Sequence, residues 1–136
     1  MKVTKANAYD VFVEAATAAR EAALACTPTP MLVGTAKSLF DNSFDTSQPV
    51  YRVNGGVCGR ASVWIRPATG PLVAMLKARG VGYKRYYGGY SVGSYEFYRP
   101  EGPLVQSMEI AQASAAAAAA VLTKYGVNCG VDSSMD

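Results

Sequence analysis

The sequence predicts an α+β fold, in which an antiparallel sheet of two hairpins is covered on one face by two long alanine-rich helices and accompanied by one short helix. Two segments, 7–26 and 103–125, carry apolar residues at helical spacing. Two others, 50–66 and 83–97, alternate with a period of two around glycine-containing turns. The 136 residues, half of them apolar and 17% charged, are expected to form one domain over 1–136.

The first helix is expected over 7–26. Asn7 or Thr4 is placed to cap its start. Its apolar face is formed by residues at spacings of three and four, namely Val11, Ala15, Ala18, Ala22 and Cys26. Pro28 and Pro30 then prevent the helix from continuing, because proline lacks the amide hydrogen that a helix interior uses.

The segment 27–49 has the weakest pattern. Residues 31–33 favour a short strand, and 39–44 favour a helical turn or an anchored loop. One of three apolar side chains is expected to anchor the segment to the core: Leu39, Phe40 or Phe44. A mobile segment would instead be a candidate lid.

The first hairpin is predicted over 50–66. Asn54-Gly55 favours a tight turn between 50–53 and 57–66, because both residues accept positive φ. The returning strand places small and apolar residues on one side, namely Val57, Gly59, Ala61, Val63 and Ile65. Its other side carries Cys58, Arg60, Ser62, Trp64 and Arg66. That second side combines two guanidinium groups with the only tryptophan, which suits the binding of an anion and a ring.

Three further elements complete the predicted fold. A short helix opens near Pro71 and closes at Gly80, and a second hairpin over 83–97 turns at Gly88-Gly89. The last helix is predicted over 103–125, where a run of alanines strongly favours helix. Two more segments follow it, a closing strand at 127–131 and a polar tail at 132–136.

Positive charge is concentrated in the middle of the chain. Residues 51–99 hold eight Lys and Arg against the single acid Glu96, a balance of +7, whereas the overall net charge is +3. The same segment contains Trp64 and seven of the nine tyrosines. Basic residues interleaved with aromatic ones suit an anionic partner that has flat groups. The alternative is a solvated face whose arginines pair with acids from the outer thirds of the chain.

The candidate ligand-binding residues combine the polar side of the first hairpin with the tyrosine-rich second hairpin. They are Arg60, Trp64, Arg66, Lys84, Arg85, Tyr86, Tyr87 and Tyr90. Alternation complicates the second group, because Lys84 and Tyr86 point opposite to Arg85 and Tyr87. Tyrosines are also simply favourable strand residues, so a purely structural role is the alternative for them.

Composition disfavours an enzyme. The chain has no histidine, which excludes Ser-His-Asp and Cys-His mechanisms and every histidine-ligated metal site. Gly80-Val81-Gly82 follows a helix instead of preceding one, so it is not a phosphate-binding loop. Cys58 and Glu96 are the remaining catalytic possibilities, but a free thiol and a surface ion pair explain them more simply. We assign no catalytic residue, no metal ligand and no cofactor.

Cysteine usage and hydropathy bear on the compartment. Three scattered cysteines do not make a disulfide framework and fit a reducing cytosol. No stretch approaches the roughly 20 consecutive apolar residues of a membrane span. We therefore expect a cytoplasmic protein without a membrane partner.

Four segments carry a resemblance to a known group of proteins: Gly55–Ala61, Val63–Pro67, Tyr86–Gly89 and Ser133–Asp136. With them the chain resembles small, uncharacterised phage-encoded proteins over nearly its whole length. No activity or site is transferred by this resemblance. It implies a protein that acts by binding, either to host factors and defence machinery in the host cytoplasm or within the virion.

Two functions follow from these observations. The first is a non-enzymatic binding protein for an anionic partner, meaning nucleic acid, a nucleotide signal or an acidic host-protein surface. Its expected role is to counter host defence. The second is a virion or oligomeric structural component in which the same aromatic residues form subunit contacts.

Overall fold

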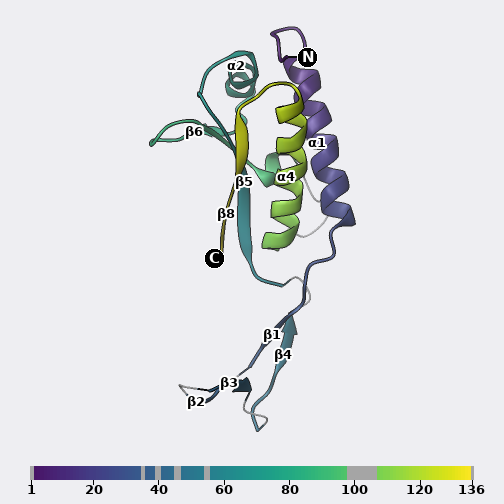
Figure 1. Cartoon of the computed structure of the whole chain (residues 1–136), viewed down its shortest axis with the longest axis vertical. Helices are drawn as coiled ribbons and strands as arrows, with labels where there is room; N and C mark the ends of the chain where they lie inside the picture. Colours follow the sequence, from purple (N-terminus) through teal and green to yellow (C-terminus); the bar gives the residue numbers. More distant parts are fainter. Residues whose placement is uncertain are drawn as a thin grey trace.

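The structure, a computed structural model, describes residues 2–34, 36–38, 41–44, 47–53, 56–97 and 107–135. Its helices are α1 (Ala8–Ala25), α2 (Pro71–Ala78), α3 (Ser94–Phe97) and α4 (Met108–Lys124). Its strands are β1 (Met31–Val33), β2 (Ala36–Ser38), β3 (Asp41–Phe44), β4 (Tyr51–Val53), β5 (Gly59–Ile65), β6 (Tyr83–Lys84), β7 (Tyr90–Gly93) and β8 (Cys129–Met135). The α+β class is confirmed: a four-stranded antiparallel sheet of order β6-β7-β5-β8 lies beside the helices (Figure 1).

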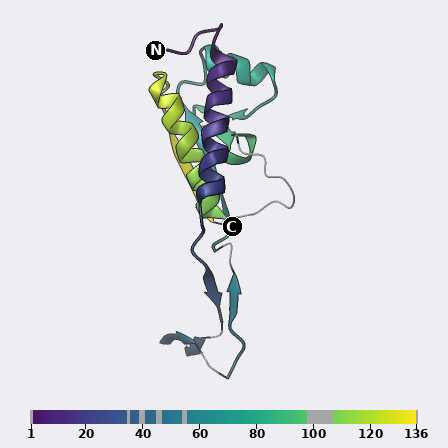
Figure 2. The ribbon, with the colours of Figure 1, turned by 90° about the vertical axis from the view of Figure 1, so that its right-hand side faces the viewer.

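The two alanine-rich helices pack against one another. Helix α4 lies on β5 and β8, and α1 packs on α4, α3 and α2 (Figures 1 and 2). Ala15 and Ala19 of α1 and Ala115 and Ala118 of α4 are buried at or near zero exposure. Methyl side chains this small allow two helices to approach closely, so the alanine runs are an interhelical contact and not low-complexity sequence.

Helix α1 begins close to where the sequence predicts, whereas α4 begins at Met108, five residues after the predicted start at 103. The side chain of Ser107 caps α4 by accepting a hydrogen bond from the amide of Ile110. Asn7 stands at the start of α1, but its Oδ1 accepts from the amide of Thr4 instead of from the helix. The predicted start of the last helix at 103–106 lies outside the described residues.

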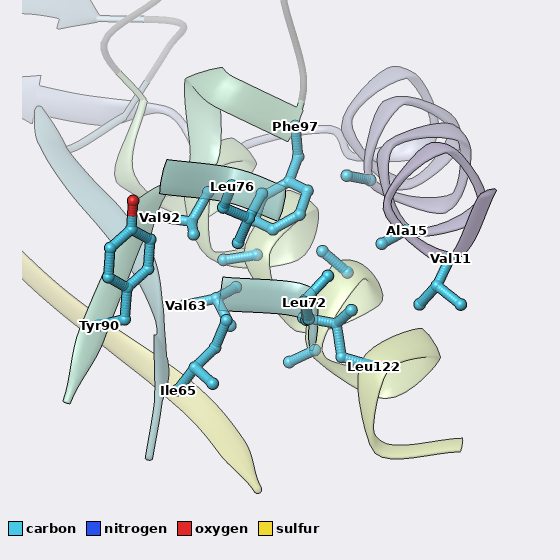
Figure 3. Packing of buried hydrophobic residues seen from close by; sticks show 14 of the residues in the cluster. Val11, Ala15, Val63, Ile65, Leu72, Leu76, Tyr90, Val92, Phe97 and Leu122 are labelled. Atoms are coloured by element: carbon cyan, nitrogen blue, oxygen red, sulfur yellow. The ribbon is translucent and has the colours of Figure 1, made fainter. Parts of the chain in front are cut away.

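The hydrophobic core lies between the sheet and the helices. Figure 3 shows side chains of β5, β7 and helices α1, α2, α3 and α4 converging there. Those of β5 and β7 are Val63, Ile65, Tyr90 and Val92, and those of the helices include Val11, Leu72, Leu76, Phe97 and Leu122. The alternation predicted for β5 is confirmed, because every second residue from Gly59 to Ile65 is buried and the intervening ones are not.

The first predicted hairpin is wrong. Strand β4 pairs with β1, and β5 pairs instead with β7 and β8. The turn residues Asn54 and Gly55 lie outside the described residues. A turn signal is local, whereas β8 offers β5 seven cross-strand pairs from Gly59↔Met135 to Ile65↔Cys129, more than β4 has residues to provide.

The chain after α4 also differs from the prediction. A strand at 127–131 and a polar tail at 132–136 were expected, but β8 continues to Met135. Asp132 and Ser134 face solvent, and their backbones complete the ladder with Ser62 and Arg60 of β5. Polar side chains are compatible with a strand whose outer side is uncovered.

The second hairpin is shorter than predicted. Strand β7 ends at Gly93, and the residues up to Phe97 form α3. Glu96 of α3 accepts hydrogen bonds from the amides of Gly82 (3.0 Å) and Gly93 (3.2 Å). The carboxylate therefore holds the hairpin to the helix through backbone groups, where a surface ion pair was expected.

Strands β1 to β4 form an arm, defined here as the described residues of 31–53, that extends away from the body (Figures 1 and 2). The strand at 31–33 is confirmed, whereas the helical turn or anchored loop expected over 39–44 is wrong for Asp41–Phe44, which form strand β3 of the arm. Leu39 and Phe40 lie outside the described residues. At the arm's base, the Glu109 carboxylate accepts from the amide of Thr29 at 3.1 and 3.2 Å.

Candidate functional site

The candidate site lies on the outer face, which is the side of the four-stranded sheet opposite α4. Cross-strand pairing places Ser62 of β5 between Gly93 of β7 and Asp132 of β8. Arg60 pairs with Ser134 in the same way, and paired residues point to the same side of a sheet. The predicted polar side of β5 is therefore a real surface, and it is shared with β8.

A hollow of about 750 Å³ opens on the outer face. It is lined by Arg60, Ala61, Ser62, Tyr83, Arg85, Tyr87, Ser91, Gly93, Ser94, Tyr95, Asp132, Ser133 and Ser134. The lining combines short side chains from adjacent strands with long arginine and tyrosine side chains. Its volume falls within the range of small-molecule pockets, about 300–1,000 Å³.

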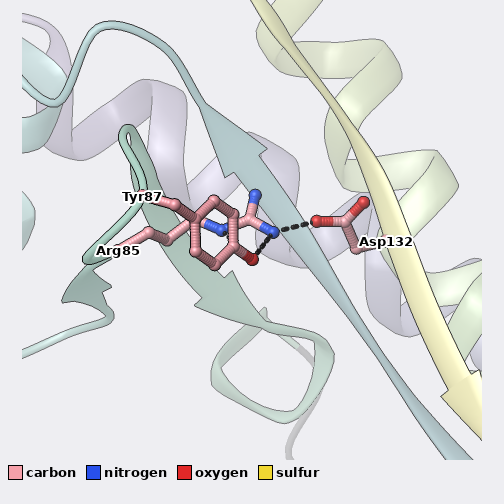
Figure 4. A network of polar contacts seen from close by, with 3 residues as sticks. All are labelled: Arg85, Tyr87 and Asp132. Atoms are coloured by element: carbon pink, nitrogen blue, oxygen red, sulfur yellow. Dashed lines mark hydrogen bonds and ion pairs between the residues drawn. The ribbon is translucent and has the colours of Figure 1, made fainter.

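Arg85 is the central charged group of the hollow (Figure 4). Its side chain runs from the β6–β7 connection to β8, where Nη2 donates to the Asp132 carboxylate. Nε donates to the hydroxyl of Tyr87 at 2.9 Å, and the guanidinium lies 4.5 Å from the centre of that ring. Only 9% of the side chain is exposed. Burial opposes the charged form, but the bonds to Asp132 and Tyr87 outweigh it and raise the pKa of Arg85.

The connection between β6 and β7 holds Arg85 in place. The amide of Arg85 donates to the carbonyl of Gly89, and the amide of Gly88 donates back to Arg85. Gly88 and Gly89 have φ of 109° and 85°, which glycine adopts without strain. The predicted Gly88-Gly89 turn thus fixes the base of the side chain while Asp132 and Tyr87 fix its tip.

Three buried polar atoms of the lining have no hydrogen-bond partner among the described residues: Arg85 Nη1, Ser91 Oγ and Ser94 Oγ. Ser91 belongs to the outer face because it pairs with Trp64 of β5 and Tyr83 of β6. An unsatisfied buried donor or acceptor costs about 1–3 kcal/mol, so such groups favour a polar occupant that bonds to them.

Trp64 and Arg66 lie on the outer face but not in the hollow. The Arg66 guanidinium stacks 5.1 Å from the centre of the Trp64 ring, and a Cβ at Gly130 would lie 2.6 Å from that ring. Trp64 is half-buried rather than sealed in the core. Arg66 instead lines a second, smaller cavity of about 320 Å³ beside the start of α2. The predicted grouping therefore divides into two parts.

The remaining predicted residues separate as well. Lys84 is exposed and Tyr86 is fully exposed, with its ring edge-on to Tyr87 at 5.9 Å, and neither lines the hollow. Tyr90 belongs to the core, where its hydroxyl donates to the carbonyl of Val81, so its assignment to a binding surface is wrong. The reason is register: Tyr90 pairs with Ile65, which faces the helices.

Of the lining residues, the predicted site contained only Arg60, Arg85 and Tyr87. The ones it missed include Tyr83, Ser91, Tyr95 and Asp132. Tyr83 lies in the tyrosine-rich segment. Alternation places its side chain on the same side as Arg85 and Tyr87, so this pattern could have identified it. Asp132 had a weaker signal, namely the alternation of small and polar residues along β8. No local pattern indicates that Asp132 meets Arg85, because 47 residues separate them.

The hollow can bind an oxyanion and a flat ring together. Arg60 and Arg85 supply guanidinium groups, and Tyr83, Tyr87 and Tyr95 supply rings. Among the described residues, no group of three acids or cysteines is placed to hold a metal ion. Cys58 is exposed and does not line the hollow, and all three cysteines are unpaired. In the part of the chain that the structure describes, no helix is long and apolar enough to cross a membrane.

No protein-family model, curated protein or solved structure matches this chain.

Proposed function

We propose that this chain is a non-enzymatic binding protein whose ligand is a small anion with a planar ring, bound in the hollow of the outer face. The observation that carries the proposal is Arg85, a buried guanidinium held at its tip by Asp132 and Tyr87 with Nη1 unbonded. A group held in this way is ready to bind without losing further side-chain entropy.

The anionic part of the ligand is assigned to Arg85 Nη1 and the nearby hydroxyls. A guanidinium binds phosphate and carboxylate oxygens through charge-assisted hydrogen bonds, which are stronger than neutral ones. Ser91 and Ser94 add two buried hydroxyls without partners. Arg60 lies at the exposed edge of the hollow and is restrained by Ser134 Oγ at 3.4 Å from its Nε.

The planar part is assigned to the tyrosine walls. Tyr83 and Tyr87 both remain about two-thirds exposed, so their ring surfaces are accessible from solvent. Stacking on such a ring contributes about 1–3 kcal/mol per nucleic-acid base. Burial of a ring against either tyrosine would also remove apolar surface from water.

The shape of the site favours a small ligand over double-stranded nucleic acid. A hollow of about 750 Å³ encloses a nucleotide-sized molecule, whereas a duplex requires a row of phosphate contacts on an extended basic surface. Asp132 on the hollow's edge would also repel a neighbouring phosphate of a continuous backbone.

Filling the hollow tests the proposal. A Cβ at Gly93 would meet no atom within 4 Å, so Gly93→Leu inserts an isobutyl group into the hollow without displacing any described neighbour. We expect it to weaken binding of cyclic and linear nucleotides at least tenfold in calorimetry. The control Ala116→Leu places a leucine side chain at an exposed position of α4 and should leave binding unchanged.

Other partners give different results in the same experiment. Salt-sensitive binding of single- or double-stranded oligonucleotides that survives Gly93→Leu would assign the partner to nucleic acid and overturn the hollow as the site. If neither nucleotides nor oligonucleotides bind at low salt, the proposal fails.

The resemblance to phage-encoded proteins supports a biological setting for this binding. A phage protein that sequesters a host nucleotide signal in the host cytoplasm would counter host defence. Three unpaired cysteines fit the reducing conditions of that compartment.

The arm favours a second candidate, a structural component of an oligomer or virion. An isolated two-stranded ribbon is at best marginally stable in water, so a ribbon extending from the body gains stability by packing on a neighbour. Tyr51 of β4 is exposed on it. Light scattering should then show an assembly that Tyr51→Ser weakens, whereas a monomer at all concentrations would exclude this candidate.

A further inference from the structure

We infer that the ligand of the hollow carries a single negative charge beside its planar ring: an oxyanion of charge −1, as in a phosphodiester or a carboxylate. Ligands with a phosphomonoester or a polyphosphate are disfavoured. The inference rests on the proposed function and specifies the charge of the ligand, which that proposal leaves open.

The charge of the lining leads to this inference. Three of its residues are charged at neutral pH, Arg60, Arg85 and Asp132, so the hollow has a net charge of +1. The middle of the sequence suggests a far more basic surface, with a balance of +7 over residues 51–99. Most of the eight basic residues of that segment lie elsewhere, since five of them do not line the hollow: Arg52, Arg66, Lys77, Arg79 and Lys84.

Arg85 offers one edge to a ligand. Its Nε and Nη2 are bonded to Tyr87, and Nη2 is also bonded to Asp132. Nη1 remains, buried and without a described partner. One free edge of one guanidinium accommodates one oxyanion.

Asp132 acts against a second charge. Its carboxylate bonds to the same guanidinium that the ligand would use, so any further negative charge on the ligand lies close to it. Repulsion between two like charges about 4 Å apart lowers affinity by about fivefold in water and by several hundredfold near a protein surface, so we expect a loss of at least about tenfold. The Asp132 carboxylate therefore lowers the affinity for multiply charged ligands relative to singly charged ones. It also keeps Arg85 in position.

Two kinds of molecule share this chemistry. One is a cyclic nucleotide, in which a phosphodiester of charge −1 is fused to a sugar that bears a base. The other is an aromatic carboxylic acid. Both combine one planar ring system with one singly charged oxyanion, and the titration distinguishes them.

The test is calorimetry of the full chain with a series of matched probes. The singly charged probes are 3′,5′-cyclic AMP, 3′,5′-cyclic GMP and indole-3-acetate, and the multiply charged ones are AMP, GMP, ATP and GTP. We expect at least one singly charged probe to bind about tenfold more tightly than AMP or GMP, with the triphosphates weakest. Equal or tighter binding of a monophosphate or triphosphate would overturn the inference while leaving the proposed function standing. If no probe binds, the proposed function itself fails.

Asp132→Asn sharpens the test, because it raises the charge of the hollow from +1 to +2 with little change in shape. We expect Asp132→Asn to raise the affinity for AMP about tenfold relative to the affinity for cyclic AMP. The control Asp10→Asn changes the net charge of the chain by the same amount at an exposed site on α1 and should leave the ratio unchanged. An unchanged ratio in Asp132→Asn would contradict the inference.

Discussion

The two faces of the central sheet differ in how closely they are packed. On the helix side, β5 and β7 contribute Val63 and Val92 to a close-packed core without exposure. On the outer side, the same strands contribute Ser62 and Ser91 to an open hollow with unpartnered polar atoms. The helix-side face is filled by buried apolar side chains, whereas the outer face leaves a hollow lined by unpartnered polar groups.

Truncation in the core should give the largest effect. Leu122 of α4 is 1% exposed, and Leu122→Ala should destabilise the fold by about 2–5 kcal/mol through lost burial and the cavity left behind. Urea unfolding measures this loss. Leu24 on α1 is 69% exposed, and Leu24→Ala should change stability by no more than about 0.5 kcal/mol. Similar losses in the two variants would mean that the core is not where the structure places it.

Substitutions at two glycines should distinguish a closely packed part of the outer face from an open part. A Cβ at Gly130 would lie 2.6 Å from the Trp64 ring, so Gly130→Ala should displace the ring and cost about 1–3 kcal/mol. Tryptophan fluorescence and urea unfolding report both changes. Gly93→Ala, where a Cβ meets nothing within 4 Å, should leave the fluorescence unaltered. An unshifted spectrum in Gly130→Ala would contradict the packing of Trp64 on β8.

Two buried serines should respond in opposite directions. Ser91 Oγ has no described partner, so Ser91→Ala should raise stability by about 1 kcal/mol and weaken ligand binding. Ser107 caps α4, so Ser107→Ala should lower stability by about 1 kcal/mol. Thermal unfolding of the ligand-free variants compares them. A loss of stability in Ser91→Ala would show that its hydroxyl is bonded and that the outer face is not incomplete.

The smallest effect is expected at an exposed ion pair on the helix side. The hydrogen bond from Lys124 to Glu14, 2.8 Å long, lowers the pKa of Glu14. A lowered folded-state pKa means that the pair stabilises the fold above the ordinary pKa of glutamate and that this contribution is lost as pH falls through the folded value. Glu14→Gln should therefore slightly flatten the acid limb of the stability profile, and less so in high salt. A steeper acid limb would contradict the pair.

The sequence predicted most of the helix side and only part of the outer face. Periodicity located α1, α2, α4 and the alternation of β5, because burial of one side imposes a regular pattern on each element. The same patterns failed for β4, whose partner is β1, and for β8, whose polar residues resembled a tail. Strand pairing depends on contacts between distant segments, and no local pattern encodes them.

The candidate site shows the same limit at the level of residues. Arg60, Arg85 and Tyr87 were identified from composition and alternation, and all three line the hollow. Tyr90 was assigned to the wrong side of the sheet, because its side depends on the register of β7 on β5. Asp132 was assigned to a polar tail and not to the site, although it bonds to the central guanidinium.

By itself, the sequence determined the approximate positions of α1, α2 and α4, which side of β5 is buried and where basic and aromatic residues concentrate. These properties follow from backbone propensity and from the period of apolar residues, both of which act over a few neighbouring positions. Only the tertiary structure decided that Arg85 meets Asp132, that β8 closes the sheet and that much of the basic charge lies outside the hollow. Those outcomes depend on strand order and register, which are set by packing of the whole chain.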